Sequence, residues 1–266
     1  MPVVPLVLCA AALHATWNAL VKPAGDRLAA IGALNAAIAL ICLPAAILVA
    51  PREAAWGALA VSSLLHVAYN LALVAAYDEG DFSQTYPIAR GSAPPLVAIV
   101  AAIALGESLD ALRIAGLGAV TAGMFVLAAG PRRPRAVALA LRVGVVIAAY
   151  TVVDGIGVRH AHTPLGYGAW LFVSSGVLTA LAVRARGGTL RAPAVTLIGA
   201  PCAIAAYGLV LWAQTHSRLA VVAGLRETSV VFGALIGVVA LHEPMGLRRV
   251  LASALVAAGA VALALG

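Results

Sequence analysis

Three side chains that can bind ions or exchange protons lie in an apolar stretch near the start of the chain. The stretch is LHATWNALVK (residues 13–22), and it carries His14, Asn18 and Lys22. Because these residues are spaced four apart, a helix would place them on one face. An imidazole can exchange protons near neutral pH, and an ammonium group attracts anions. The spacing therefore predicts a polar column along the wall of a cavity. In the alternative interpretation, His14 and Asn18 only hydrogen-bond between helices, and Lys22 extends to the lipid headgroups.

Two arginines, Arg90 and Arg226, lie inside apolar segments, within about 10 Å of the segment midpoints by helical rise. A guanidinium at this depth can bind a carboxylate or a phosphate through two parallel hydrogen bonds. The alternative is a fixed internal ion pair with Asp154 or Glu227. Because Glu227 directly follows Arg226, we expect this pair to neutralise itself and Arg90 to be the arginine that contacts a ligand. All four residues are candidates for substrate or ion binding.

Asp154 is an acidic residue in the middle of an apolar segment. A carboxylate at that depth can exchange a proton as a cavity opens to alternate sides, and His14 can do the same. Either group would make protons a coupling ion. A fixed salt bridge explains Asp154 equally well, so both interpretations stay open.

Tyrosines and an amide accompany these groups. Tyr69 and Asn70 share one side of a predicted helix with His66, and Tyr207 is among their counterparts in the second half of the chain. Aromatic walls with hydrogen-bonding tips suit amphipathic metabolites, although Tyr near helix ends also forms interfacial belts. The predicted cavity-lining residues of this kind are Tyr69, Asn70, Tyr86 and Tyr150.

The composition indicates the setting of these polar groups. Of 266 residues, 63% are hydrophobic and only 10% are charged, and the mean hydropathy is +1.04. Soluble domains carry about 25% charged residues, so the chain is predicted to be an all-α protein that crosses a lipid bilayer many times. The net charge of +7 lies mostly in short joints between apolar segments, which excludes a nucleic-acid-binding face.

Ten apolar segments are long enough to be membrane-spanning helices. The joints between them are too short to hold a soluble domain, so any binding site must lie among the helices. The predicted helices cover residues 2–22, 28–50, 54–77, 82–105, 109–129, 137–157, 165–184, 194–215, 219–241 and 247–266.

The two halves of the chain resemble each other. When the chain is shifted by 136 positions, scarce charged residues coincide: Arg90 with Arg226, Glu107 with Glu243, and Arg113 with Arg249. The sequence therefore predicts two five-helix repeats, residues 1–130 and 137–266, joined by a basic linker at 131–136. Because five is odd, the second repeat would enter the bilayer from the opposite side. Such inverted repeats are typical of secondary transporters, with the binding site at the repeat interface.

Two stretches resemble the closing segment of an EamA repeat, from the drug/metabolite transporter superfamily. They are YPIARGSAPPLVAIVAAIALGESLDALRIAGLGAVTAGMFVLA (86–128) and GLRETSVVFGALIGVVALHEPMGLRRVLASALVAAGAVALAL (224–265). LHATWNALVK is similar to the repeat's opening helix, with its Trp followed by Lys. The second copy departs from the pattern, since AAYTVVDGIGV (148–158) lacks the Trp and HEP (242–244) replaces the usual Gly-Glu. We read Glu107 and Glu243 as turn or cap residues.

The repeat architecture and the resemblance together favour a secondary active transporter in a bacterial inner membrane. It would move a small metabolite, such as an amino acid, organic anion or drug, by alternating access; the alternative is a flippase for a lipid-linked carrier. The sequence has no nucleophile–base pair, metal-ligand cluster or nucleotide-binding motif, so we expect no enzymatic activity and no cofactor. A monomer and a homodimer both remain open. The resemblance implies cytoplasmic termini, whereas the excess of Arg in the joints opposite the N-terminus favours termini outside.

Two further expectations concern the helices themselves. Pro87, Pro94 and Pro95 predict a kinked or locally unwound helix beside Arg90, while the proline-free segment 219–241 is expected to be unbroken. The helices at 109–129 and 247–266 are expected to pack together as scaffold. Small residues four apart suit such a contact: Gly118 with Ala122, and Ala254 with Ala258.

Overall fold

The part of the chain that the structure describes is helical. The computed structural model describes residues 3–21, 26–80, 82–130, 133–191, 195–241 and 246–266, and these ranges contain no strand. The helices are α1 (Val3–Val21), α2 (Arg27–Leu48), α3 (Trp56–Glu79), α4 (Phe82–Leu105), α5 (Ala111–Leu127), α6 (Pro134–His160), α7 (Pro164–Ala185), α8 (Ala200–Gln214), α9 (Leu219–Arg226), α10 (Ser229–Leu241) and α11 (Leu247–Leu265). A 3-10 turn, η1 (Glu53–Ala55), precedes α3, and a π-helical turn, η2 (Val195–Gly199), precedes α8. Each predicted segment contains a helix, and the segment 219–241 contains two.

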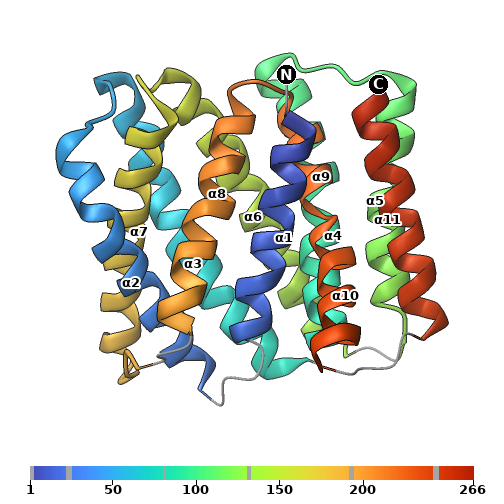
Figure 1. Ribbon diagram of the computed structural model, residues 1–266, viewed down its shortest axis with the longest axis horizontal. Coiled ribbons are helices and arrows are strands. Elements are labelled where there is room, and N and C mark those ends of the chain that lie inside the picture. The colour runs from blue at the N-terminus through green and yellow to red at the C-terminus, as the bar shows by residue number, and fades with distance from the viewer. Residues whose placement is uncertain (1–2, 22–25, 81, 131–132, 192–194, 242–245) are drawn as a thin grey trace.

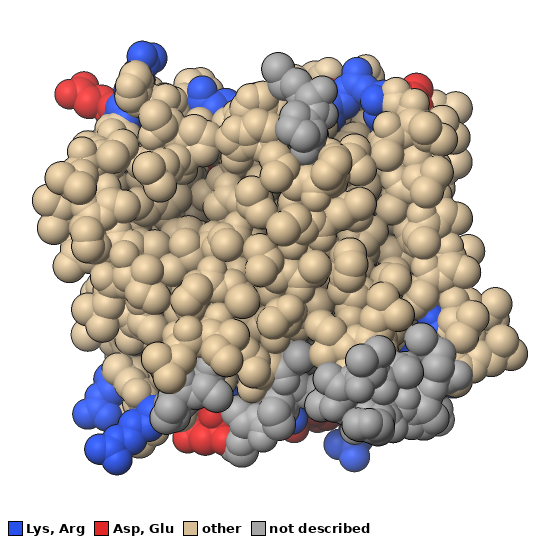
Figure 2. Space-filling view, in the orientation of Figure 1, with Lys and Arg blue, Asp and Glu red and all other residues tan. Residues whose placement is uncertain are grey.

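The exterior of the bundle is apolar over the length of its helices. Within the described ranges, eight helical stretches are long and apolar enough to cross a membrane, and Val3–Asn18 and Ala111–Leu127 are shorter apolar helices. Large aliphatic side chains such as Ile103 (82% exposed) point outwards, whereas Figure 2 shows charged side chains along two opposite edges. The chain is therefore a multi-pass integral membrane protein.

The helices stand side by side in a flattened bundle (Figure 1). The α2–α7 pair forms one end of the bundle and the α5–α11 pair forms the other. Between them, α1 packs against α8, α3 against α6, and α4 against both α6 and α9. The two ends of the chain lie at the same edge of the bundle (Figure 1).

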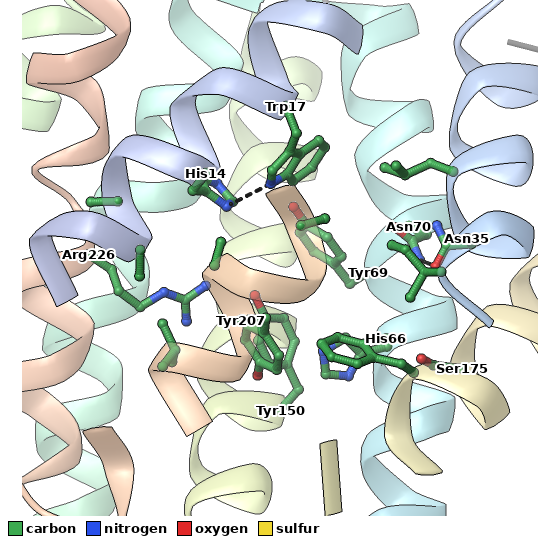
Figure 3. Close-up of a pocket in the computed structure, with 18 residues that line it drawn as sticks. His14, Trp17, Asn35, His66, Tyr69, Asn70, Tyr150, Ser175, Tyr207 and Arg226 are labelled. Atoms are coloured by element: carbon green, nitrogen blue, oxygen red, sulfur yellow. Dashed lines mark hydrogen bonds between the residues drawn. The ribbon is translucent and has the colours of Figure 1, made fainter. Parts of the chain in front are cut away.

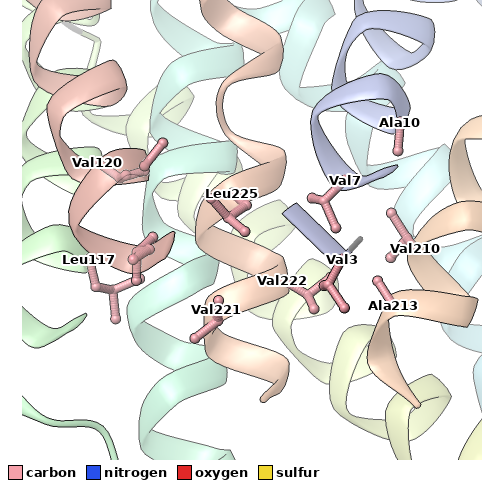
Figure 4. Packing of buried hydrophobic residues seen from close by; sticks show 12 residues of the cluster. Val3, Val7, Ala10, Leu117, Val120, Val210, Ala213, Val221, Val222 and Leu225 are labelled. Atoms are coloured by element: carbon pink, nitrogen blue, oxygen red, sulfur yellow. The ribbon is translucent and has the colours of Figure 1, made fainter. Parts of the chain in front are cut away.

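The short helix α9 is enclosed on all sides by protein. All eight of its residues are buried. Val222 and Leu225 belong to an apolar cluster that also takes in Val7 of α1, Val210 of α8 and Leu117 of α5. Figure 4 shows the α9 side chains of this cluster between those of α1 and those of α5 and α11. This packing fixes the position of Arg226, the last residue of α9.

The helix break lies where the prolines are not. Helix α4 continues through Pro87, Pro94 and Pro95, so of the two expected effects, a kink or a local unwinding beside Arg90, the unwinding is wrong. The segment 219–241 breaks instead, between α9 and α10 at Glu227 and Thr228.

The hydrogen bonds around this break explain how the helix is interrupted without a proline. The backbone N–H groups of Glu227 and Thr228 bond to carbonyls three residues earlier, and the Thr228 hydroxyl donates to the Leu225 carbonyl at 2.7 Å. A threonine side chain that occupies a carbonyl in this way competes with the helical ladder.

A proline does accompany a helix irregularity at the start of α8. Pro201 lies at the start of α8, directly after the π-helical turn η2. Because proline lacks an N–H, it cannot bond to the carbonyl four residues earlier, and the wider turn lies at that point. Pro44 lies within the continuous helix α2.

The loop between α4 and α5 is tied to the start of α9. Glu107 accepts a hydrogen bond from the Leu219 N–H (2.8 Å) and pairs with Arg159 (2.8 Å). Glu107 is thus a cap, as expected, but it caps a distant helix. Asp110 caps α5, and the backbone N–H of Arg113 lowers the pKa of its carboxyl group. Glu243 lies outside the described residues.

Helices α5 and α11 pack together, as predicted, but through other residues than expected. A Cβ on Gly116 would lie 2.8 Å from the Gly259 carbonyl oxygen, and one on Gly259 would lie 2.6 Å from that of Gly116. The two backbones therefore touch at these glycines. Gly118 faces outwards, with nothing within 4 Å of its Cβ position. The spacing of small residues thus predicted the correct pair of helices but the wrong contact face of α5.

We expect Gly259→Val to lower the stability of the purified protein by about 1–3 kcal/mol, because the added side chain must push α5 away. Thermal unfolding in detergent measures this change. Gly118→Val is the matched control, since it has the same cost in helix propensity but meets open space. Equal effects of the two substitutions would show that the close contact is not what requires glycine at 259.

Candidate functional site

A cavity of about 110 Å³ lies in the middle of the bundle, lined by α1, α2, α3, α6, α7, α8 and α9. Figure 3 shows Arg226 on one side, Asn35 and Asn70 on the other, and tyrosines between them. Five of the predicted site residues line it: His14, Tyr69, Asn70, Tyr150 and Arg226. Trp17, Asn35, His66, Ser175 and Tyr207 contribute further polar atoms.

Arg226 presents its charge to this cavity. It is only 7% exposed, and its guanidinium lies 5.2 Å from the centre of the Tyr207 ring, as a cation–π contact. Arg226 forms no ion pair with any carboxylate in the described part of the chain. It is the one Lys, Arg, Asp or Glu among the described lining residues. An anion that entered the cavity would therefore meet a buried, uncompensated positive charge.

Glu227 pairs with Arg90 rather than with its neighbour Arg226. The Arg90 Nη2 lies 2.9 Å from Oε1 of Glu227, and its Nε donates to Oε2 at 3.2 Å. Both residues are buried, at 2% and 3% exposed. The expectation that Arg226 is neutralised and Arg90 is free is thus reversed. Successive residues on a helix point about 100° apart, so adjacency in sequence does not bring the two side chains together.

His14 is held in one tautomer by its neighbours. The Trp17 indole N–H donates to Nδ1 of His14 (3.3 Å), which must therefore carry a lone pair. The proton of the neutral ring is then on Nε2, which lies 3.4 Å from the Tyr86 hydroxyl and can donate to it. This arrangement fits a neutral imidazole. Tyr86 does not line the cavity but supports His14 from behind.

Asn18, the next residue of the predicted column, does not reach the cavity. The Asn18 amide donates to the His14 carbonyl of its own helix at 2.8 Å, and Asn18 is not a lining residue. Lys22 lies outside the described residues. On α1 the wall is formed by Ala10, Ala11, His14 and Trp17. The Asn18 amide thus bonds within its own helix, so this contact is neither part of a cavity wall nor the hydrogen bond between helices of the alternative interpretation.

The far side of the cavity is neutral. Asn70 donates to Asn35 (3.4 Å) and to Thr179 (3.3 Å), which joins α3 to α2 and α7. Tyr69 packs edge-to-face on Tyr150, with ring centres 5.6 Å apart. The wall thus offers amide and hydroxyl groups between aromatic faces.

Asp154 lies directly behind the wall and is fully buried. Its Oδ1 accepts a hydrogen bond from the Tyr167 hydroxyl at 2.9 Å, and its Oδ2 accepts one from the Tyr207 hydroxyl. Among the described residues, the group that can carry a positive charge within ion-pair distance is His66, whose Nε2 lies 3.9 Å from Oδ2. Among the described residues, no Lys or Arg pairs with Asp154, so of the two interpretations left open, the fixed salt bridge to arginine is not formed there.

Comparisons with known proteins agree with this architecture. Residues 134–265 match the EamA-like transporter family. The chain belongs to the EamA-like transporter family. The resemblance read from the sequence is thereby confirmed, and the match covers the predicted second repeat.

The fold of this EamA-like protein is also found in solved structures. One, titled "Crystal structure of protein", superposes with a TM-score of 0.81 at 19% identity and covers 100% of this chain and 99% of that chain. This likeness concerns the fold. No curated protein sequence matches the chain.

Two residues of the EamA-like site carry more than the sequence analysis assigned to them. His66 and Tyr207 were noted only as neighbours and counterparts of Tyr69, yet both line the cavity and both contact Asp154. The available signal for His66 was its position on the same helix face as Tyr69 and Asn70, and for Tyr207 it was its place as their counterpart in the second half of the chain. Their shared contact with Asp154 of α6 was visible only in the three-dimensional structure. Within the described ranges, no cluster of three or more His, Cys, Asp and Glu could hold a metal ion.

We expect Arg90→Met to destabilise the EamA-like fold by about 3–5 kcal/mol, because it leaves Glu227 buried and unpaired. The double variant Arg90→Met/Glu227→Leu should recover most of that loss, since both charges are then removed. Unfolding of the purified proteins in detergent measures both values. A double variant as unstable as the single one would contradict the assignment of Glu227 as the partner.

Proposed function

We propose that this protein is a secondary active transporter that moves a small organic anion across the bacterial inner membrane by alternating access. The EamA family consists of membrane transporters of small molecules, which supports the general class. The observation that carries the finer proposal is Arg226, a buried guanidinium without a carboxylate partner among the described residues, which faces the central cavity. A carboxylate or phosphate would supply the missing negative charge through two hydrogen bonds.

The cavity wall restricts the rest of the substrate. Opposite Arg226 lie neutral amides and hydroxyls, and between them lie Tyr69, Tyr150, Tyr207 and Phe172. A substrate with one anionic end and a planar or apolar body fits these surroundings. A second charge on the substrate would have no counter-ion on the described wall. The volume of about 110 Å³ is below the 300 Å³ or more of pockets for drug-sized ligands, so we infer a small substrate or a narrow state of the cycle.

The pattern of helix contacts supports two inverted repeats, 1–130 and 137–266. If each predicted segment is exchanged with its counterpart in the other repeat, α1 takes the place of α6 and α8 that of α3. The α1–α8 contact then corresponds to the α6–α3 contact. By the same exchange, the α4–α6 contact corresponds to the contact of α9 and α10 with α1. The α2–α7 pair and the α5–α11 pair each join a helix to its own counterpart, so the exchange leaves these two contacts unchanged. A pseudo-two-fold axis in the membrane plane would generate this pattern, and it would give the cavity two related states, one open to each side.

The break between α9 and α10 lies where such a transporter needs an adjustable backbone. Interrupted helices at membrane depth are typical of transporter binding sites. Here the interruption directly follows Arg226, and the Arg90–Glu227 pair fixes it to α4. We infer that rotation at this break changes the side of the membrane to which Arg226 is accessible.

The substrate can be sought by comparing extracellular and intracellular metabolites between cells that lack and cells that overproduce the protein. A small anion that changes reciprocally in the two strains is then tested in proteoliposomes. Activity confined to membrane-embedded, lipid-linked substrates would favour the flippase alternative.

We expect Arg226→Gln to lower transport of the identified anion by about 10- to 100-fold, the effect of losing charge-assisted hydrogen bonds worth about 1.5–3 kcal/mol. Arg226→Lys should lose less, because the charge remains. Initial uptake rates in proteoliposomes measure the change. Arg135→Gln is the matched control, since the Arg135 side chain is 80% exposed and does not line the cavity. Unchanged flux in Arg226→Gln would remove Arg226 from the mechanism.

A further inference from the structure

We propose that His66 and Asp154 together form a proton-binding site that couples this protein to the proton gradient, with the proton moving in the same direction as the substrate anion. This inference rests on the proposed transport function and names its coupling ion. It follows from the hydrogen bonds around the two residues, from the position of His66 on the cavity wall, and from the neighbouring Arg226.

The surroundings of Asp154 leave one negative charge without a balancing cation. The carboxylate is 0% exposed, and both of its oxygens accept hydrogen bonds from phenols, which are neutral. An uncompensated charge at membrane depth costs several kcal/mol. Among the described residues, His66 is the one group within ion-pair distance of Asp154 that can become cationic. A proton on His66 would therefore complete the charge balance.

The ring of His66 is oriented to receive this proton. Its Nδ1 lies 2.9 Å from the Ser62 carbonyl oxygen and 3.2 Å from the Ser62 hydroxyl. In the tautomer that donates to this carbonyl, the shorter of the two contacts, Nδ1 carries the hydrogen. In the neutral ring, Nε2 then presents a lone pair towards the Asp154 carboxylate at 3.9 Å. Two acceptors face each other with no hydrogen between them. One added proton converts the pair from a net charge of −1 to 0 and allows a hydrogen bond once the ring shifts slightly.

The proton can reach the pair from the cavity. His66 lines the cavity and its side chain is 17% exposed, whereas Asp154 is sealed behind it. Tyr150 covers one face of the His66 ring, with centres 4.3 Å apart, and Tyr207 packs against its edge at 5.5 Å. The titratable and charged groups around the pair are Tyr69 on α3, Tyr150 on α6, Tyr167 on α7, Tyr207 on α8, Arg226 on α9, His14 on α1 and the Arg90–Glu227 pair.

Of these groups, Arg226 connects the proton to the substrate. Tyr207 donates its hydroxyl hydrogen to Asp154, while its ring lies under the Arg226 guanidinium. The positive charge of Arg226 disfavours a further positive charge on His66. An anion bound at Arg226 cancels that charge and favours protonation of the pair. By linkage, the proton also favours binding of the anion. Anion and proton therefore bind together, and one of each moves without net charge.

The proton site is tested first without any substrate. Infrared difference spectra of the full-length protein in lipid are recorded between about pH 8 and about pH 5, the range in which imidazole titrates. We expect imidazole and carboxyl bands that disappear in both His66→Gln and Asp154→Asn. His160→Gln and Asp110→Asn are matched controls. His160 is exposed and has the same bond to the carbonyl four residues earlier, and asparagine can replace Asp110 as a helix cap.

Two spectral outcomes would overturn the proposal. One is identical difference spectra in the wild type and both variants. The other is bands that vanish in His66→Gln but persist in Asp154→Asn, which would assign the proton to the histidine alone. Since the two variants remove different side chains, misfolding of one leaves the other to decide.

The linkage to substrate is tested with benzenesulfonate, a permanent anion with an apolar ring. Added to weakly buffered purified protein with a pH-indicating dye, it should cause uptake of up to one proton per bound anion in the wild type. Uptake should be lost in His66→Gln and Asp154→Asn. Binding without proton uptake in the wild type would overturn the coupling. Absence of binding would count against the proposed anion class instead, while the infrared result still decides the proton site.

Discussion

The ion pair between Arg90 and Glu227 determines the charge of the central cavity. Burying either group alone would cost several kcal/mol, so at this depth each requires a partner with good geometry. By pairing with the carboxylate next to Arg226 in sequence, Arg90 leaves the Arg226 guanidinium facing the cavity, in contact with the Tyr207 ring and without a carboxylate partner among the described residues. The same pair fastens α4 to the break between α9 and α10. A structural ion pair and an available binding charge are thus two consequences of one contact.

The cavity is built in two layers. The inner layer consists of aromatic rings, amides and Arg226, and it can contact a substrate directly. The outer layer consists of Asp154, Tyr86 and the Arg90–Glu227 pair, each of which contacts an inner-layer residue or its sequence neighbour. Because Asp154, Arg90 and Glu227 are buried, their charges act on the inner layer through hydrogen bonds and through space, in surroundings of low dielectric.

The helical segments were predictable because a membrane-spanning helix needs a long apolar run with polar ends, and hydropathy records both. The break in 219–241 was not predictable, because no proline marks it. Its contacts are the Thr228 hydroxyl bond to the Leu225 carbonyl and the ion pair of Glu227 with Arg90. The prolines of α4 were misleading for the converse reason. A helix packed on several sides can stay helical where its prolines leave backbone carbonyls without their usual partners. Likewise, the α5–α11 pair was expected, but the side that carries Gly116 and Gly259 depends on helix rotation, which small-residue spacing leaves open.

The sequence by itself determined which elements cross the membrane and which ionisable residues must lie at depth, because hydropathy and charge are local properties. It also indicated the family through the two EamA-like stretches. Only the tertiary structure decided the partners. Glu227 pairs with a residue 137 positions away instead of its neighbour, Asn18 turns back to its own helix, and Asp154 meets His66 and Tyr207 from two other helices. The physical reason is that a side chain's direction follows from the rotation and packing of its helix, and these are fixed by contacts between segments far apart in the chain.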